Sequence, residues 1–306
     1  MEGSIPMRTA PTKVVASESP WRRALSDFTS SRIAVAGFII LSILIMSALL
    51  APYITPQNPY DLQQLNVLDK DMHPFAHGVD GRTYLLGTDD QGRDIYSGIV
   101  FGLRTSLIVG FGSTSVALVI GVFFGLIAAY FGGWLETIIM RVVDLQLSFP
   151  SMLIALILLA LIGPGLDKVM IAIVAVQWAY YARTVRSAAI VERQKEYIEA
   201  AKCLGLSNAR VLFSHLLPNS LPPIIVVATI TLAQAILLEA TLSFLGVGVP
   251  VTQPSLGGLI KKGSDVMLSG EYWVSFFPGM VLLVTMVSLN LVGDQLRDAL
   301  NPRIKK

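Results

Sequence analysis

Long apolar runs separated by short polar segments limit most strongly what this chain can fold into. A helix needs about 20 residues to cross a hydrocarbon core about 30 Å thick. Six stretches approach or exceed that length, namely 33–54, 105–130, 142–162, 169–182, 224–245 and 273–293. Composition agrees, because 53% of the 306 residues are hydrophobic and 14% are charged, whereas about 25% are charged in a typical soluble domain. We therefore expect an all-α, polytopic membrane protein with six transmembrane helices.

The polar segments divide the chain into successive parts. We expect a leader over 1–32, a first span over 33–54, an outer loop over 55–104, a five-helix core over 105–293 and a tail over 294–306. The first apolar run is too long for the core of a signal peptide, so we expect it to remain as an uncleaved span. A polar segment over 191–220 interrupts the five-helix core.

Basic residues gather on one side of the expected membrane. Most of the chain's 23 Lys and Arg residues lie in the leader, around 132–141, in the segment 183–220 and in the tail, whereas Asp residues dominate the loop 55–98. The positive-inside rule then predicts that both termini are cytosolic. The net charge of +2 is too small to indicate a nucleic-acid partner. Cys203 is the single cysteine, so the chain can form no internal disulfide.

The stretch "EYIEAAKCLGLSNARVLFSHLLPN", residues 196–219, is polar and helix-forming although it lies between apolar runs. Tyr197, Ala200, Ala201 and Leu204 recur at helical spacing, which predicts a short amphipathic helix with one apolar stripe. A cytosolic helix of this kind has two interpretations. It docks into a groove of a partner protein, or it lies on the lipid headgroups.

A sharp turn is expected directly after this helix. Gly205 can adopt the left-handed conformation of a helix C-terminal cap, and Ser207 or Asn208 can cap the start of a second helix. That second helix is expected to stop near Pro218, because the residue before a proline is pushed out of the helical region. The segment is therefore predicted to be a helix, a turn and a helix.

The same segment resembles the EAA loop of ATP-binding-cassette (ABC) importer permeases. Six residues match the spacing of that motif: Glu199, Ala200, Ala201, Gly205, Leu217 and Pro218. His215 begins "H-x-L-P-N", a form similar to that of the dipeptide, oligopeptide and nickel branch. Other stretches similar to this branch begin at Leu85, Glu239 and Phe276. The chain thus resembles the C-type permease subunit of this branch.

The resemblance implies a type I ABC importer permease fold in the bacterial inner membrane, with no catalytic residue and no cofactor or metal in this chain. It implies that ATP and Mg are bound by two cytosolic ATPase subunits, and that a second, homologous permease completes a heterodimer. An extracytoplasmic binding protein would deliver the substrate. Peptides are the expected substrate, and nickel or another small solute is the alternative.

The resemblance also implies that the polar segment couples the ATPases to the membrane helices. The residues implied in this role are Glu199, Ala200, Ala201, Lys202, Gly205, Leu206, Ser207, Asn208, Leu217 and Pro218. Glu199 either pairs with a basic residue of an ATPase or keeps the hairpin solvated.

Several residues in the expected spans are candidates for the translocation path or its gate: Asp144, Pro150, Gln177, Glu239, Ser243 and Asn290. Asp144 alternatively pairs with Arg141 one helical turn before it, and Pro150 is expected to kink its helix. Glu239 attracts a cationic group of the substrate or serves packing and gating. Gln177 and Asn290 bridge helices or line a wet path.

Two other classes of protein remain open at this point. An ion-gradient-driven secondary transporter also has acidic residues inside the membrane, as Asp144 and Glu239 are expected to be. A non-transporting assembly subunit would use the hairpin to recruit a soluble partner. The sequence has no phosphate-binding loop and no metalloprotease motif. His73, His77 and Asp80 form only a loose cluster, so we expect no metal site there.

Overall fold

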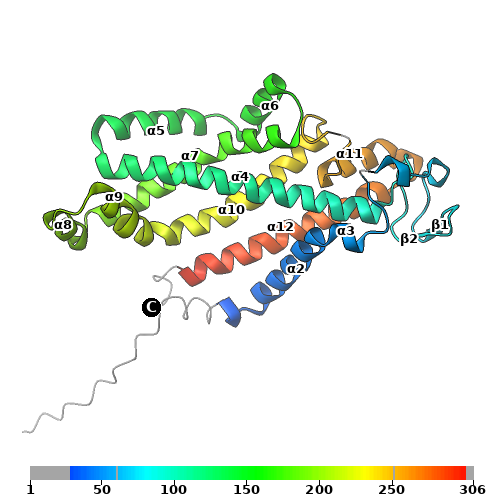
Figure 1. Cartoon of the computed structure of the whole chain (residues 1–306), viewed down its shortest axis with the longest axis horizontal. Coiled ribbons are helices and arrows are strands. Elements are labelled where there is room, and N and C mark those ends of the chain that lie inside the picture. Colours follow the sequence, from blue (N-terminus) through cyan, green and yellow to red (C-terminus); the bar gives the residue numbers. More distant parts are fainter. Residues whose placement is uncertain (1–27, 60, 251, 301–306) are drawn as a thin grey trace, which may run out of the picture.

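The computed structural model describes residues 28–59, 61–250 and 252–300. Most of the expected leader over 1–32 and the end of the expected tail, residues 301–306, therefore lie outside the described residues. Figure 1 shows an elongated bundle of helices. One end carries α8 (Glu196–Cys203) and is called the α8 end. The opposite end carries β1 (Ala76–His77) and is called the β1 end.

Four helices of the described chain are long and apolar enough to cross a membrane. They are α2 (Arg32–Leu49), α4 (Ile95–Phe131), the continuous helix Asn208–Phe244 and α12 (Trp273–Leu300). The pair α5 (Gly133–Leu147) and α6 (Ser151–Ile162) counts as a fifth if it forms one broken span. The all-α fold is confirmed, whereas the expected number of six spanning helices is not.

The expected span 142–162 is broken in the structure. It is split between α5 and α6, which are bent by 90° relative to each other. Pro150 stands at the break as the residue preceding α6. Because proline has no N–H and its ring clashes with the preceding helical turn, the helix cannot run straight through this position. The prediction of a kink at Pro150 is therefore confirmed, and the bend is sharp enough to divide the span.

The expected span 169–182 lies within the longer helix α7 (Leu166–Arg193). This helix packs along α4 in the middle of the bundle (Figure 1). A Cβ added to Gly121 of α4 would lie only 2.3 Å from Cβ of Tyr181, and one added to Gly125 would lie 2.6 Å from the carbonyl oxygen of Ala182. Glycine therefore permits this close approach. Most residues of α7 are buried or partly buried in the bundle.

The second expected helix of the polar segment does not stop near Pro218. α9 (Asn208–Arg210), the π-helical turn η3 (Val211–Leu216) and α10 (Leu217–Phe244) form one continuous helix that includes three prolines. Side chains supply hydrogen bonds near these prolines: Asn219 Nδ2 donates to the His215 carbonyl at 2.7 Å, and Ser220 Oγ donates to the Leu216 carbonyl at 2.9 Å. Such bonds and π turns let membrane helices tolerate proline.

Short elements collect at the β1 end (Figure 1). They are α3 (Ala51–Ile54), η1 (Leu62–Gln64), η2 (Val67–Asp69), β1, β2 (Thr83–Tyr84), α11 (Leu256–Val266) and η4 (Met267–Ser269). The two strands pair antiparallel. The buried carboxylate of Asp69 holds this loop together, because it accepts hydrogen bonds from the Val79 N–H at 2.8 Å and from the Tyr84 hydroxyl at 3.0 Å. Burial and the nearby Asp69 carboxylate raise the pKa of Tyr84 to about 12.

Candidate functional site

The turn after α8 has the geometry that the sequence predicts. Gly205 has a φ of +72°, a left-handed conformation that glycine adopts without steric cost. The Leu206 N–H donates to the Ala201 carbonyl at 3.3 Å, and the Gly205 N–H donates to the Lys202 carbonyl at 2.9 Å. These two bonds form a Schellman motif. Ser207 then caps the next helix by accepting a hydrogen bond from the Arg210 N–H at 3.4 Å.

The apolar stripe predicted for α8 is largely wrong. Ile198 and Ala201 are the buried residues of this helix, whereas Ala200 and Leu204 are exposed. Tyr197 is partly exposed, and its hydroxyl donates to Glu192 Oε2 at 2.8 Å. The predicted stripe included Ala201, which is buried, but omitted Ile198. Ile198 has the larger apolar side chain to bury. As a result, Ala200 and Leu204 face outward rather than into the bundle.

The buried face of α8 belongs to an apolar cluster that several helices share. Ile198 and Ala201 pack in it with Leu126 of α4, Val185 of α7 and Leu216 of η3. Leu217 packs against the same cluster. The cluster therefore ties α8 to the ends of three long helices.

Polar contacts fasten the same segment to the bundle. The Tyr130 hydroxyl at the end of α4 donates to Asn208 Oδ1 at 2.7 Å, and Lys202 Nζ lies 5.3 Å from the centre of the Tyr130 ring. Arg193 of α7 donates from Nη1 to the Ala129 carbonyl at 2.9 Å. Asn208 and Lys202 are thus engaged with the bundle itself. No local pattern in the sequence indicates these roles of Tyr130 and Arg193.

The remaining candidate coupling residues lie in three places. Glu199 is exposed and borders a hollow of about 390 Å³ together with Arg193 and Lys202. Gly205 is at the exposed tip, with no atom within 4 Å of the position of an added Cβ. Pro218 is exposed in the first turn of α10. Ala200 and Leu204 are also exposed at the tip, beside Gly205.

Three of the candidate path residues are buried between helices. Gln177 of α7 donates from Nε2 to the Thr231 carbonyl of α10 at 2.8 Å. Glu239 of α10 is fully buried, and its carboxylate accepts hydrogen bonds from Ser106 Oγ at 2.6 Å and from Ser243 Oγ at 2.8 Å. These contacts favour bridging between helices for Gln177 and Glu239, whereas Ser243 bonds to Glu239 within α10. Asn290 is exposed on α12.

Asp144 does not pair with Arg141, as one interpretation of the sequence expected. Its carboxylate forms an ion pair with Arg183 of α7. The side chains remain exposed, at 56% for Asp144 and 48% for Arg183. The helices α5 and α7 share a second ion pair, in which Arg186 Nε lies 2.7 Å from Glu136 Oε1. Arg183 was not identified because the contact joins residues far apart in the sequence.

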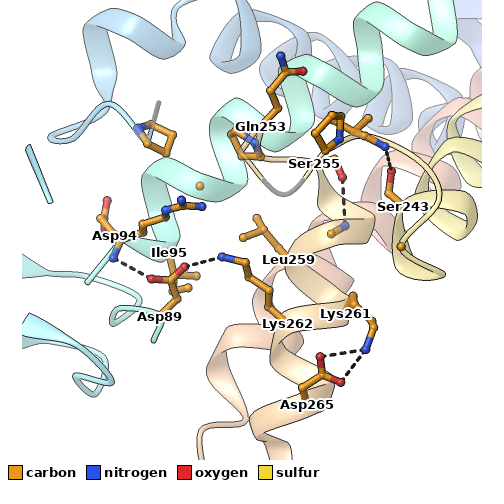
Figure 2. A pocket seen from close by; sticks show the side chains of 18 of the residues that line it. Asp89, Asp94, Ile95, Ser243, Gln253, Ser255, Leu259, Lys261, Lys262 and Asp265 are labelled. Atoms are coloured by element: carbon orange, nitrogen blue, oxygen red, sulfur yellow. Dashed lines mark hydrogen bonds and ion pairs between the residues drawn. The ribbon is translucent and has the colours of Figure 1, made fainter. Parts of the chain in front are cut away.

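A cavity of about 540 Å³ lies at the β1 end between the start of α4, α11 and the segment that precedes α11. Figure 2 shows Lys262 directed toward Asp89, with 3.4 Å between Nζ and Oδ2, and Lys261 paired with Asp265 at 2.8 Å. Asp94 caps α4 by accepting a hydrogen bond from the Ser97 N–H at 2.9 Å. Burial raises the pKa of Asp94 above its ordinary value. No local sequence pattern indicates this cavity, because its walls come from distant segments.

Comparison with known proteins decides the class of the chain. A family model described as binding-protein-dependent transport system inner membrane component matches residues 121–306. The chain belongs to this family of permeases. A second model, the N-terminal TM domain of oligopeptide transport permease C, matches residues 19–74. The two matches leave residues 75–120 between them, which include the end of the outer loop and the first part of α4.

Relatives of this permease match along nearly their whole length. The dipeptide transport system permease protein DppC of Alkalihalophilus pseudofirmus is 40% identical over 94% of this chain and 91% of its own. The oligopeptide transport system permease protein OppC of Bacillus subtilis is 36% identical over 94% of this chain and 91% of its own. Family membership therefore supports the permease interpretation over a secondary transporter or a scaffold subunit.

Solved structures show the same fold. A chain of the MetNI methionine ABC transporter, described as inward facing, aligns with a TM-score of 0.54 and 22% sequence identity. The alignment covers 67% of this chain and 96% of that chain. The permease therefore has the fold of type I ABC importer permeases.

Proposed function

We propose that this permease moves short peptides across the inner membrane by alternating access, driven by ATP that two partner ATPases hydrolyse. The names of DppC and OppC, which match over 94% of this chain, support peptides as the substrate. The proposed complex contains a second, homologous permease, two ATPase subunits that bind ATP and Mg, and an extracytoplasmic binding protein. In this arrangement the α8 end and both termini are cytosolic.

The α8 segment is proposed to receive the movement of an ATPase. The attachment of α8 supports this role, because Ile198 and Ala201 are buried against the ends of long helices while Ala200, Leu204 and Gly205 face outward. Small residues at the tip permit a partner surface to approach closely. A displacement of the tip is then transmitted through packed side chains rather than absorbed by a loose loop.

The continuous helix Asn208–Phe244 extends this connection into the membrane. It begins one turn after Gly205 and reaches the buried carboxylate of Glu239 near its other end. Movement of α8 is therefore proposed to tilt this helix together with the end of α4, to which Tyr130 is bonded. An exposed ion pair between Glu199 and an ATPase would add about 0–1 kcal/mol, so the shape of the tip carries most of the coupling.

The test is ATP-driven uptake by the full complex reconstituted in lipid vesicles. Gly205→Asp forces a residue with a Cβ into a left-handed conformation and adds charge at the tip, and Glu199→Arg reverses the charge beside it. Both variants are expected to assemble in the membrane, with Gly205→Asp losing most peptide uptake and Glu199→Arg losing a smaller part. Cys203→Ser, an exposed neighbour on the same helix, is the matched control and is expected to transport normally.

Wild-type uptake by the Gly205→Asp and Glu199→Arg complexes would contradict the coupling role. Uptake of nickel in place of peptides by the unaltered complex would assign the alternative substrate. Uptake that follows an imposed ion gradient without ATP would overturn the energy source.

A further inference from the structure

The helix α5 carries two different stripes along its exposed side. One stripe is polar and consists of Thr137, Arg141, Asp144 and Ser148. The neighbouring stripe is apolar and consists of Trp134, Ile138, Leu145 and Phe149. Both stripes recur at helical spacing along α5, and Ser148 and Phe149 continue them just past its last residue, Leu147. Lipid suits the apolar stripe, whereas the polar stripe requires water or protein opposite it.

The Asp144–Arg183 pair lies deep along this polar stripe. Asp144 is about 16 Å from the start of α5 and Arg183 about 15 Å from the end of α7, at 1.5 Å per helical residue. Those distances are about half of a hydrocarbon core about 30 Å thick. Trp134, which is 73% exposed in the first turn of α5, suits a position at the membrane interface. The pair therefore lies well inside the ends of both helices, and Asp144 falls within the apolar run 142–162.

Exposure at this depth excludes lipid as the neighbour of the pair. A charged side chain at the bilayer centre costs at least about 2.5–3.5 kcal/mol on insertion scales. Both partners nevertheless leave about half of their side-chain surface open. Polar groups continue beyond the pair, because the Ser151 and Tyr180 hydroxyls lie 3.3 Å apart on exposed side chains at the break between α5 and α6. The surface around the pair therefore faces water or another protein chain rather than lipid.

We infer that the Asp144–Arg183 pair lines the substrate route and receives the two charged ends of a peptide, the ammonium group at Asp144 and the carboxylate at Arg183. This inference rests on the proposed function. Every free peptide has these two ends whatever its side chains, so a pair of opposite charges suits a permease that accepts many sequences. Each end would exchange water for an oppositely charged group within an apolar run, where unpaired charge is costly.

A second ion pair on the same two helices provides a matched control. Glu136 and Arg186 also join α5 to α7, but both are more buried, at 25% and 32% exposure. Glu136 lies in the first turn of α5. Replacing the Glu136–Arg186 pair removes one ion pair between α5 and α7. It leaves the charges of the polar stripe in place.

The experiment replaces each pair by neutral residues that still bond to each other. The Asp144→Asn/Arg183→Gln permease is compared with Glu136→Gln/Arg186→Gln in full complexes of equal amount in lipid vesicles, with radiolabelled dialanine as the substrate. Uptake per complex is expected to fall at least fivefold for the first variant and less than twofold for the second. Normal uptake by the first variant, or an equal fall in both, would show that the pair only clamps α5 to α7.

Thiol labelling tests whether water reaches the polar stripe, and it does not rely on uptake. In a Cys203→Ser background, Ser148→Cys lies on the polar stripe, and Leu145→Cys lies at similar depth on the apolar stripe. A charged, membrane-impermeant thiol reagent is expected to label the first and not the second. Absence of labelling at Ser148→Cys would overturn the inference. If the unaltered complex fails to import dialanine, the proposed peptide substrate fails, while the labelling still reports on the route.

Discussion

The Tyr130 hydroxyl and the Asn208 side chain form a hydrogen bond of 2.7 Å that joins the end of α4 to the start of the continuous helix Asn208–Phe244. Tyr130 is 8% exposed, and Lys202 of α8 lies over its ring. One aromatic residue therefore contacts both sides of the turn at Gly205. This contact fixes the angle at which the exposed tip leaves the bundle.

Tyr130→Phe is expected to loosen this connection. It removes the hydroxyl and keeps the ring, so the loss is about 0.5–1.5 kcal/mol for one intramolecular hydrogen bond. We expect a lower unfolding temperature of the purified permease and less peptide uptake per ATP hydrolysed. Combination with Asn208→Ala in a double-mutant cycle isolates the bond. Fully additive effects of the two substitutions would contradict the contact.

Tyr53→Phe is the control for this substitution. Tyr53 is 85% exposed in α3, at the other end of the bundle. Its replacement is expected to change neither the unfolding temperature nor the coupling ratio.

Ile198→Ala and Leu204→Ala are expected to separate stability from coupling within α8. Ile198 is fully buried, so its truncation costs about 2–5 kcal/mol. Leu204 is 80% exposed, so its truncation changes stability by less than about 0.5 kcal/mol. We expect Ile198→Ala to lower the unfolding temperature, and Leu204→Ala to weaken copurification with the ATPases at an unchanged unfolding temperature. The opposite result would mean that the predicted stripe was correct.

Gly257→Ala is expected to separate α11 from α10. A Cβ at Gly257 would lie 2.0 Å from the Ala240 carbonyl oxygen, so the backbone must shift. Overpacking of this kind costs about 1–3 kcal/mol. Gly279→Ala in α12 is the control, because no atom lies within 4 Å of its added Cβ. A lower unfolding temperature for Gly257→Ala, with an unchanged one for Gly279→Ala, would confirm the packing. Equal unfolding temperatures for the two variants would contradict it.

Local chemistry explains which features the sequence could predict. The turn at Gly205, its cap at Ser207 and the break at Pro150 depend on neighbouring residues, and all three occur as expected. Contacts between distant segments were beyond such reasoning. Ile198 is buried because α4 and η3 meet it there, and Arg183 pairs with Asp144 because α5 folds back along α7. The prolines of α10 misled the prediction because a π turn and nearby side chains accommodate them.

Acidification is expected to tighten the contact between the outer loop and the start of α12. Burial, and then the negative charge of Asp71, raise the pKa of Glu271 above its ordinary value. Glu271 lies beside Trp273, whose Nε1 donates to the Thr88 carbonyl of the loop at 3.3 Å. For a carboxyl with a raised pKa, the folded state favours the protonated form. Its contribution to stability is present below the unfolded pKa and is lost as the pH rises through the folded pKa.

Hydrogen exchange of the loop residues 61–94, corrected for intrinsic rates, measures this effect. Protection is expected to increase as the pH falls toward the ordinary carboxyl pKa of about 4.3. Glu271→Gln removes the charge, so its loop is expected to be more protected than the wild-type loop at neutral pH and less dependent on pH. Asp94, whose pKa is also raised, is retained in both proteins, so the difference between them isolates Glu271. Equal pH dependence in the two proteins would show that the Glu271 carboxyl does not control how the loop docks.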